Sequence, residues 1–176
     1  KWYETLFDAY NNEKAVGEKT ASYLVDPLAP KLIKEKLGNE TKLIAILRNP
    51  IYRLFSNYLY FAGQIPKKVS LIEACQSKEF KRLELLESGN YLKHINRYFQ
   101  YFNKNQFLFI IYDDLIADPL ITLKQVFNFL GVNEDFVPEN YNKFYNKSVG
   151  RSALAKTIKY AGGYIKQKFP ELYSPL

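Results

Sequence analysis

The strongest structural signal in the sequence is the run Lys42-Leu43-Ile44-Ala45-Ile46-Leu47-Arg48-Asn49-Pro50. Its first seven residues are almost all apolar and are bounded by polar residues, which is typical of a short parallel strand covered on both faces. Asn49-Pro50 then ends the strand and begins a helix, because proline fits the first helical turn. A second strand of the same kind is predicted at Phe107–Ile111. The run therefore predicts a strand–helix unit within an α/β fold.

Helical patterns surround these two strands. We expect helices at residues 2–10, 26–37, 70–88, 89–102 and 118–130, and a basic amphipathic helix at 151–168. Strands separated by helices are typical of a layered α/β structure with a central parallel sheet. A third, short strand is expected at 14–16. Since a stable sheet has more strands than these, we expect the fold to be incomplete at its N-terminal end.

Length and composition limit the class of protein. With 176 residues, the chain is expected to form a single domain, 1–176. Hydrophobic residues make up 47% and charged residues 24%, which are globular values. No apolar run approaches the ~18 to 20 residues that cross a bilayer, so neither a membrane span nor a secretory leader is expected. The chain begins at Lys1 and contains no methionine, so we expect it to be a processed or excised piece.

Two further features of the composition bear on the compartment and the ligand. The single cysteine, Cys75, cannot form an internal disulfide, which mildly favours a reducing compartment. Lysine and arginine total 25 against 18 acidic residues, so the formal net charge is +7. This surplus suits an anionic ligand such as phosphate, sulfate or nucleic acid.

The residues that follow the first strand could bind an anion. In open α/β sheets, ligands bind outside the carboxyl ends of the strands. Arg48 lies at such an end and Ser56 follows on the helix, so a guanidinium and a hydroxyl could converge on one phosphate. Arg53 lies between them and could add a cation or form a structural pair with an acidic residue. Spacing alone favours a plainer interpretation, in which Arg48 caps a neighbouring helix and Ser56 is an ordinary helix serine.

Three other residues could take part in catalysis. Glu18 and Lys19 are adjacent, so a carboxylate could accept a hydroxyl proton while an ammonium stabilises an anion, although an exposed pair in a turn is the commoner outcome. The segment is not a nucleotide-binding loop, because the upstream glycine of GxxxxGK[ST] is absent. His94, the sole histidine, could act as a lone acid or base, or be structural. One imidazole excludes sites that need two, and no metal is expected.

Taken in order, four segments resemble the sulfotransferases that use 3′-phosphoadenosine 5′-phosphosulfate (PAPS). The branch they resemble most contains the heparan-type carbohydrate sulfotransferases and their bacterial relatives. Residues 42–58 look like the family's 3′-phosphate signature, a strand followed by Arg-x-Pro-x-x-Arg and Ser. Residues 17–23 are similar to its Glu-Lys-Ser/Thr segment, residues 89–94 to a helix start near the acceptor site, and residues 107–119 to its last strand with the Asp-Pro that follows.

The resemblance implies a role for each matched residue. Arg48 and Ser56 would hold the 3′-phosphate of the nucleotide. Glu18 would be the catalytic base, Lys19 would neutralise developing charge, and His94 would lie near the acceptor. The resemblance also implies a sulfotransferase fold, which is a three-layer α/β sandwich like that of P-loop NTPases, with PAPS as the donor, its bisphosphate PAP as the product and no metal.

One departure from the family pattern matters. The 5′-phosphosulfate loop, a Lys-x-Gly-Thr-Thr type turn, has no counterpart in the sequence, and both it and the first strand are expected upstream of Lys1. Without this loop the sulfuryl group loses its cradle of backbone amides, so the chain as written is expected to be inactive or very feeble, and its parent protein an enzyme. The disulfide of secretory-pathway members is impossible with one cysteine, which favours a bacterial, cytoplasmic member. The Golgi lumen is the alternative for a eukaryotic one.

The resulting interpretation is transfer of a sulfuryl group from PAPS to a hydroxyl of a carbohydrate, a small alcohol or a carrier-bound hydroxyacyl chain. A carrier protein or a polysaccharide is the partner expected beside the donor, and nucleic acid is not. The rival interpretation is a non-catalytic basic module that binds an anionic polymer or an acidic carrier domain. Its cations would come from the last predicted helix: Lys156, Lys159, Lys166 and Lys168. A nucleoside kinase is a third option.

Overall fold

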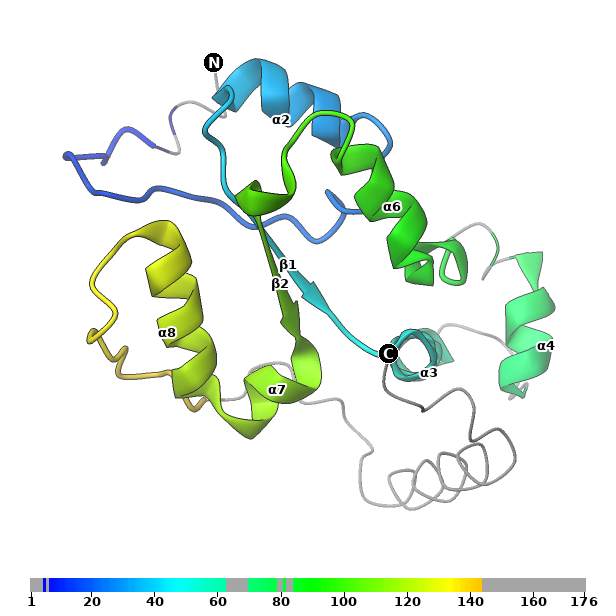
Figure 1. Ribbon diagram of the computed structural model, residues 1–176. Coiled ribbons are helices and arrows are strands. Elements are labelled where there is room, and N and C mark those ends of the chain that lie inside the picture. Colours follow the sequence, from blue (N-terminus) through cyan, green and yellow to red (C-terminus); the bar gives the residue numbers. More distant parts are fainter. Residues whose placement is uncertain (1–4, 6, 63–69, 79–80, 82–83, 144–176) are drawn as a thin grey trace. The chain divides into compact units, whose positions relative to one another are not determined.

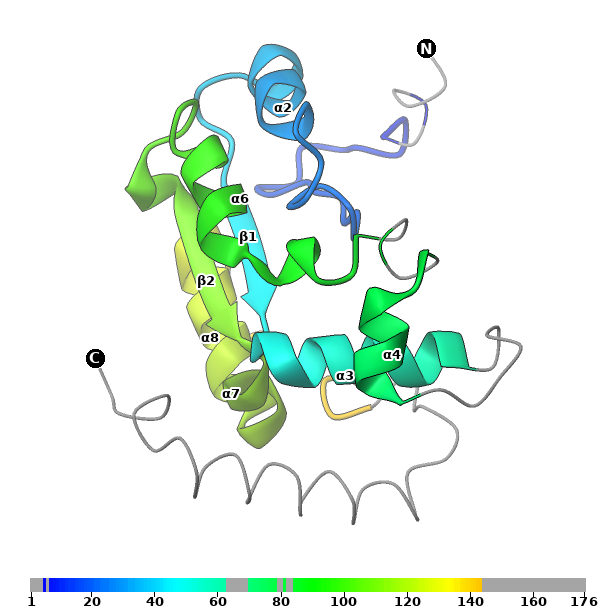
Figure 2. The same cartoon turned by 90° about the vertical axis from the view of Figure 1, so that its right-hand side faces the viewer.

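The computed structural model describes residues 5, 7–62, 70–78, 81 and 84–143. Figures 1 and 2 show its elements in two views. They are α2 (Ala29–Leu37), β1 (Leu43–Leu47), α3 (Pro50–Ala62), α4 (Leu71–Gln76), η1 (Glu87–Gly89), α6 (Tyr91–Tyr98), η2 (Lys104–Gln106), β2 (Phe107–Ile111), α7 (Tyr112–Ala117) and α8 (Pro119–Leu130). Residues Lys1–Asn142 form one compact unit, to which the description refers. The predicted basic helix at 151–168 lies outside the described residues, and a single domain over 1–176 stays a prediction.

The two predicted strands are confirmed and lie side by side. β1 and β2 pair in parallel, with Leu43 opposite Phe107 at one end and Leu47 opposite Ile111 at the other. Parallel neighbours need a long crossover connection, and α3, α4 and α6 form it here. The carboxyl ends of both strands therefore meet at the same edge of the sheet, where the predicted anion-binding residues follow β1.

A single side chain helps to set the strand register. The side-chain amide of Gln106, the residue before β2, donates to the carbonyl oxygens of Asn39 at 2.6 Å and Thr41 at 2.9 Å. Both carbonyls precede β1, so the start of one strand is tied to the approach of the other. A slip by one residue would break both hydrogen bonds and turn every strand side chain to the opposite face.

Helices lie on both sides of the strands. Figures 1 and 2 show α6 and α8 on opposite sides of β1 and β2. On the α6 side, the ring of Phe107 makes edge contacts with three aromatic rings, those of Tyr98, Phe99 and Phe102. On the other face, Ile110 is buried and shares a cavity wall with Thr122 of α8. Because alternate strand residues face opposite sides, this is the layered α/β arrangement that the sequence predicts.

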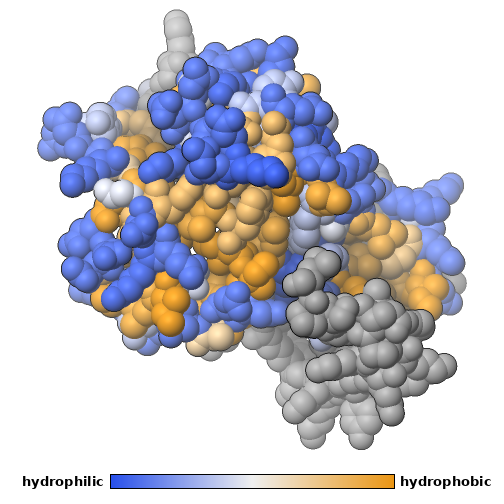
Figure 3. Space-filling view, in the orientation of Figure 1, coloured by the Kyte–Doolittle hydropathy of each residue, from blue (hydrophilic) through white to orange (hydrophobic). Residues whose placement is uncertain are grey.

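Strand side chains are nonetheless partly exposed. Ile44 and Ile46 of β1 are 41% and 54% exposed, and Phe109 and Ile111 of β2 are 38% and 48% exposed. Figure 3 shows apolar residues gathered in the middle of one face of the molecule. The prediction that both faces of the first strand are covered is therefore only partly met. None of the described helices is long and apolar enough to cross a bilayer.

A second small core lies between α3 and α4. Ala74 is fully buried, and Leu85 packs against it together with Leu54 and Tyr58. α4 starts with a capping box, in which the Ser70 hydroxyl and the Glu73 carboxylate each bind the other residue's backbone. The Ser70 hydroxyl, followed by its backbone amide, holds the pKa of Glu73 below its usual value. The cap makes this short helix a defined support for α3.

Four predicted elements differ from the structure. One is the helix expected at 89–102, which is shorter and forms α6 at Tyr91–Tyr98. The short strand at 14–16 is wrong, because residues 15–20 are exposed and have no regular secondary structure. α2 begins at Ala29 instead of 26, because the Asp26 carboxylate accepts a hydrogen bond from the Leu28 amide at 2.8 Å and Pro30 occupies the first turn. Within the helix expected at 70–88, α4 ends at Gln76, and Lys78 and Lys81 are again helical after a bend at Ser77. Part of the helix expected at 2–10 lies outside the described residues.

α8 supplies a prediction about stability. The Asp118 carboxylate accepts hydrogen bonds from the amides of Leu120 and Ile121, both at 3.1 Å, and so caps the helix. We expect Asp118→Ala to lower the free energy of unfolding by about 1 kcal/mol, and Asp118→Asn to retain most of it, because asparagine also caps. Urea unfolding measures both. Asp135→Ala, which removes an exposed carboxylate, is the charge control, and an equal loss there would contradict the capping role.

Candidate functional site

Arg48 occupies the junction between β1 and α3. It directly follows the last strand residue, and α3 begins two residues later at Pro50. The Asn49 side-chain oxygen accepts hydrogen bonds from the amides of Ile51 at 3.0 Å and Tyr52 at 3.4 Å, which caps α3. The chain therefore turns sharply after the strand and leaves Arg48 at the carboxyl end of the sheet, as the sequence predicts.

The guanidinium of Arg48 is only partly satisfied. Its Cζ lies 4.9 Å from the centroid of the Tyr112 ring, so a cation–π contact joins the carboxyl ends of the two strands. Its Nε is buried and has no hydrogen-bond partner within the described part of the chain. An unpaired buried N–H costs free energy, so an anion that accepted a hydrogen bond from it would be stabilised.

Ser56 lies within α3 and is half-buried. It belongs to the same strand–turn–helix unit as Arg48, which is the arrangement that the predicted pairing requires. The convergence of the two side chains on one phosphate stays a prediction.

Arg53 has a structural role. Its Nη2 donates to the carbonyl oxygen of Leu85 at 2.5 Å, which ties α3 to the segment before η1. A Cβ atom at Gly89 would lie 3.2 Å from that same Nη2, so glycine leaves room for the guanidinium. The partner of Arg53 is thus a backbone carbonyl and not the acidic residue that was one of the two predicted alternatives. Its Nε, like that of Arg48, is buried without a hydrogen-bond partner among the described residues, so a role as a further cation stays a prediction.

Glu18 and Lys19 are exposed and lie in a stretch without regular secondary structure. The phenol of Tyr23 donates a hydrogen bond to the Oε1 atom of Glu18 at 2.5 Å. A carboxylate accepts at two oxygens, so this bond orients the group and leaves capacity for a substrate proton. The structure therefore presents Glu18 as a held, accessible carboxylate with an ammonium beside it in the chain.

His94 is buried, with 3% of its surface exposed. Its Nε2 lies 3.0 Å from the carbonyl oxygen of Glu87, and its Nδ1 lies 3.0 Å from Nη2 of Arg97. Arg97 in turn donates through Nη1 to the carbonyl oxygen of Val25 at 3.1 Å. The imidazole is therefore enclosed by protein partners on both nitrogens.

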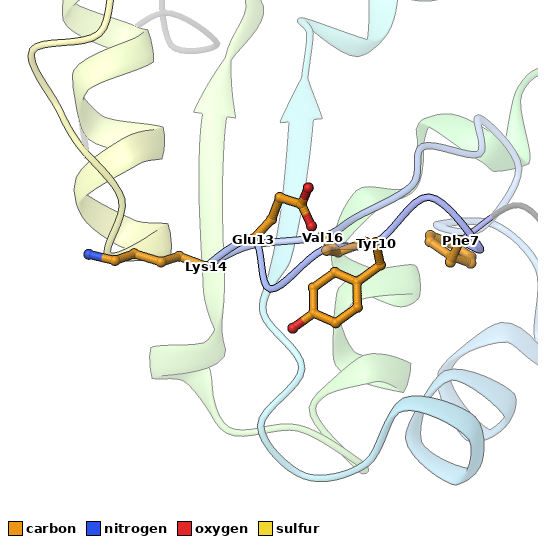
Figure 4. A pocket seen from close by; sticks show the side chains of 5 residues that line it. All are labelled: Phe7, Tyr10, Glu13, Lys14 and Val16. Carbon is orange, nitrogen blue, oxygen red and sulfur yellow. The ribbon is translucent and has the colours of Figure 1, made fainter.

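An open cavity lies in the segment that precedes Glu18. It measures about 410 Å³ and is lined by Phe7, Tyr10, Glu13, Lys14 and Val16. Figure 4 shows the Lys14 ammonium pointing away from Tyr10 and Val16. The ring of Tyr10, 55% exposed, thus offers a flat apolar surface that a ligand could contact.

Hydrogen bonds connect one predicted site residue, Glu18, to the helix that contains another, and the structure adds two tyrosines to the candidate site. Hydrogen bonds link Glu18 through Tyr23 to Tyr98 of α6, the helix that also contains His94. Tyr98 follows His94 by one helical turn, so helical spacing could have indicated it. Tyr112 lies at the carboxyl end of the second strand, a position that the topology rule also singles out.

Metal ligands and the cysteine thiol are the other groups that could form a reactive centre. Among the residues that the structure describes, no three His, Cys, Asp or Glu side chains gather as metal ligands. Burial raises the pKa of the Cys75 thiol above its usual value. Because the thiolate is the reactive form, Cys75 is a packing residue beside Ala74 and Leu85.

The chain is similar in sequence to known proteins. Residues 1–162 match the family model described as "Sulfotransferase domain". The heparan sulfate glucosamine 3-O-sulfotransferase 3B1 of Homo sapiens is 29% identical over 164 residues, which are 88% of this chain and 40% of that protein. The bifunctional heparan sulfate N-deacetylase/N-sulfotransferase 1 of Caenorhabditis elegans is 28% identical over 183 residues, 98% of this chain and 21% of that protein. The chain therefore spans two fifths or less of the length of these relatives.

The fold of this chain is similar to that of a solved structure. The crystal structure of a sulfotransferase from Alicyclobacillus acidocaldarius matches with a TM-score of 0.72 and 24% identity, over 99% of this chain and 71% of that one. The similarity confirms the predicted α/β fold class and its sulfotransferase topology.

Proposed function

Because the chain belongs to the sulfotransferase domain family, we propose that it transfers a sulfuryl group from PAPS to a hydroxyl group of a carbohydrate. The family match confirms the resemblance described from the sequence. The observation that carries the donor assignment is the buried, unpartnered Nε of Arg48 at the carboxyl end of β1. It is a hydrogen-bond donor that needs an anionic acceptor at the place where α/β sheets bind ligands.

The donor would bind through its 3′-phosphate. Arg48 would offer its charged fork, oriented by the ring of Tyr112, and Ser56 a hydroxyl from α3. When bound, PAPS supplies a sulfuryl group that is activated by its link to a phosphate. The residues on the two sides of the β1–α3 turn fit this anion, because they combine a cation, a neutral donor and an unfilled buried N–H.

Glu18 would act as the general base. Its exposed carboxylate, held at one oxygen by Tyr23, would accept the proton of the attacking hydroxyl. Lys19, its neighbour, would neutralise part of the negative charge that develops on the departing side. Together these residues supply proton removal and charge stabilisation, and neither role requires a metal ion.

A carbohydrate is the acceptor class that we propose. The name of the human relative specifies heparan sulfate glucosamine, and that of the Caenorhabditis elegans relative specifies heparan sulfate. The cavity before Glu18 offers the exposed ring of Tyr10, which can pack against a sugar, and the carboxylate of Glu13 in its lining, which can accept a hydrogen bond from a sugar hydroxyl. The net charge of +7 suits a polyanionic chain. A carrier-bound acceptor has no comparable support.

We further propose a reducing, cytoplasmic compartment for the protein. The support is the single cysteine, whose thiol is partly buried and free in the structure. A bacterial source stays a prediction from the sequence.

A thermal-shift measurement tests the donor assignment. We expect PAP at about 100 times its Kd to stabilise the chain by about 2.7 kcal/mol, which raises Tm by several degrees. The matched control is 5′-AMP, which lacks the 3′-phosphate and is expected to leave Tm nearly unchanged. Equal shifts with both nucleotides would contradict recognition of the 3′-phosphate.

The same measurement separates the rival function. A non-catalytic basic module would be stabilised by heparin or polyphosphate and not by PAP. Its predicted cations on the last helix lie outside the described residues, so the measurement with heparin or polyphosphate must use the whole chain. Stabilisation by the polymer alone would favour that module over the enzyme.

A further inference from the structure

We infer that one face of α6, which carries His94, Arg97 and Tyr98, positions the turn that holds Glu18. His94 then acts through Arg97 and not on the substrate. The inference rests on the proposed function, in which Glu18 is the base. We call residues 20–26 the base-holding turn, because Tyr23 within it donates to the Glu18 carboxylate.

The base-holding turn has little internal support. Its backbone hydrogen bonds run from the amides of Val25 and Asp26 to the carbonyl oxygen of Ser22, both at 3.0 Å, with a weaker one from Tyr23 to Thr20 at 3.5 Å. A single turn of this kind is marginal by itself, because few hydrogen bonds offset the lost chain entropy. Its position must therefore come from contacts with other elements.

Two side chains of α6 make such contacts. The Tyr98 hydroxyl donates to the carbonyl oxygen of Tyr23 at 2.8 Å, and Nη1 of Arg97 donates to that of Val25 at 3.1 Å. Both bonds join residues more than 70 positions apart in the chain. In Figure 1 the blue N-terminal segment approaches α6 where these bonds form. Burial raises the pKa of Tyr98 to about 12, so its phenol stays protonated and donates across the physiological range.

The hydrogen bonds of His94 define its protonation state. Arg97 can only donate, so the His94 Nδ1 atom, 3.0 Å from its Nη2, must accept. The ring proton is then on Nε2, which donates to the carbonyl oxygen of Glu87 at 3.0 Å. Lys93 binds the Glu87 carboxylate, which lowers the pKa of that acid.

A neutral His94 with both nitrogens engaged cannot exchange a proton with a substrate unless it first gives up a protein partner. What it does in the structure is to hold Arg97 in the orientation that reaches Val25. His94, Arg97 and Tyr98 are thus positioning residues for Glu18. Truncation of any of them should release the turn before it affects the nucleotide site on β1 and α3.

Hydrogen exchange and kinetics on the full-length protein test this inference. In Tyr98→Phe and Arg97→Gln, we expect amide exchange in residues 20–26 to become several-fold faster while the β1 amides stay protected. We expect kcat to fall about tenfold, as the loss of one hydrogen bond to the turn implies, with KM for PAPS unchanged. Tyr101→Phe, which alters an exposed phenol just beyond α6, is the matched control and should change neither readout.

The role of His94 is tested by two substitutions, of which only one keeps a hydrogen-bond acceptor for Arg97. Asparagine can place an oxygen near the position of Nδ1 and so retain the bond to Arg97, whereas alanine cannot. We therefore expect His94→Asn to recover most of the kcat and exchange protection that His94→Ala loses. If His94→Asn is as inactive as His94→Ala while residues 20–26 exchange at the wild-type rate, His94 acts directly on the substrate and the inference is wrong.

Two more outcomes keep the inference separate from the proposed function. Unchanged exchange of residues 20–26 in both Arg97→Gln and Tyr98→Phe would overturn the positioning role, whatever happens to kcat. Faster exchange in these variants, together with full turnover of Glu18→Gln, would leave the positioning role standing and remove Glu18 as the base. Tyr98→Phe deletes only one oxygen atom, so of these variants it is the least prone to misfold.

Discussion

In the full-length protein, Glu18→Gln is expected to lower kcat by about 10²- to 10⁴-fold, because an amide cannot accept the proton of the acceptor hydroxyl. Glutamine keeps the size of the side chain and an oxygen that can accept from Tyr23, so the base-holding turn should remain in place. Donor affinity should change little, since no contact joins Glu18 to Arg48 or Ser56 within the described residues. Steady-state kinetics with PAPS and a heparan-type acceptor, and calorimetry with PAP, measure the two quantities.

The control for this substitution is Glu40→Gln. Glu40 is exposed and lies before β1, so the change removes the same charge at a distance from the base-holding turn. We expect wild-type turnover in this variant. Turnover of Glu18→Gln that equals that of Glu40→Gln would show that the carboxylate at position 18 does not take the proton.

Arg48→Ala is expected to raise the Kd for PAP by about 10- to 100-fold, since hydrogen bonds to charged groups contribute about 1.5 to 3 kcal/mol. Arg48→Lys should lose part of this affinity, because an ammonium keeps the charge but not the planar fork that Tyr112 orients. Both losses should exceed that of Ser56→Ala, which removes a neutral donor. Isothermal titration calorimetry at fixed ionic strength gives the values.

Lys124→Ala controls for net charge in this series. Lys124 is an exposed residue of α8, so its loss changes the overall field by the same unit without altering the β1–α3 junction. We expect no more than a small, salt-dependent change in Kd. Wild-type affinity in Arg48→Ala, or an equal loss in Lys124→Ala, would refute the phosphate assignment.

Continuous apolar runs and cap signals were good predictors of the fold. Residues 43–47 and 107–111 became strands because nearly every side chain in them is apolar, a pattern that favours a parallel sheet. α8 has the predicted bounds, since Asp118 caps it and Gly131, at a φ of +78°, ends it. Ala15 and Val16 failed as a strand because two apolar residues in a polar stretch have no sheet partner among the described residues to satisfy their backbone.

The candidate site was predictable in its residue types and not in its contacts. Arg48 could be located because a residue that directly follows a parallel strand lies at the ligand-binding edge. Arg53, equally basic and on the same helix, could not be assigned in advance. Its guanidinium binds the Leu85 carbonyl, and that partner comes from a segment 32 residues away.

Local patterns depend on residues a few positions apart. They specified the strands, the cap of α8, the family and the position of Arg48, because short-range sterics and hydrophobic burial act along the chain. The environment of each functional side chain depends on segments that meet only in the folded molecule. Tyr112 over Arg48, and α6 against the base-holding turn, are contacts of that kind. His94 shows the difference most clearly: its helix follows from spacing, whereas its two hydrogen-bond partners, and hence its protonation state, follow from packing.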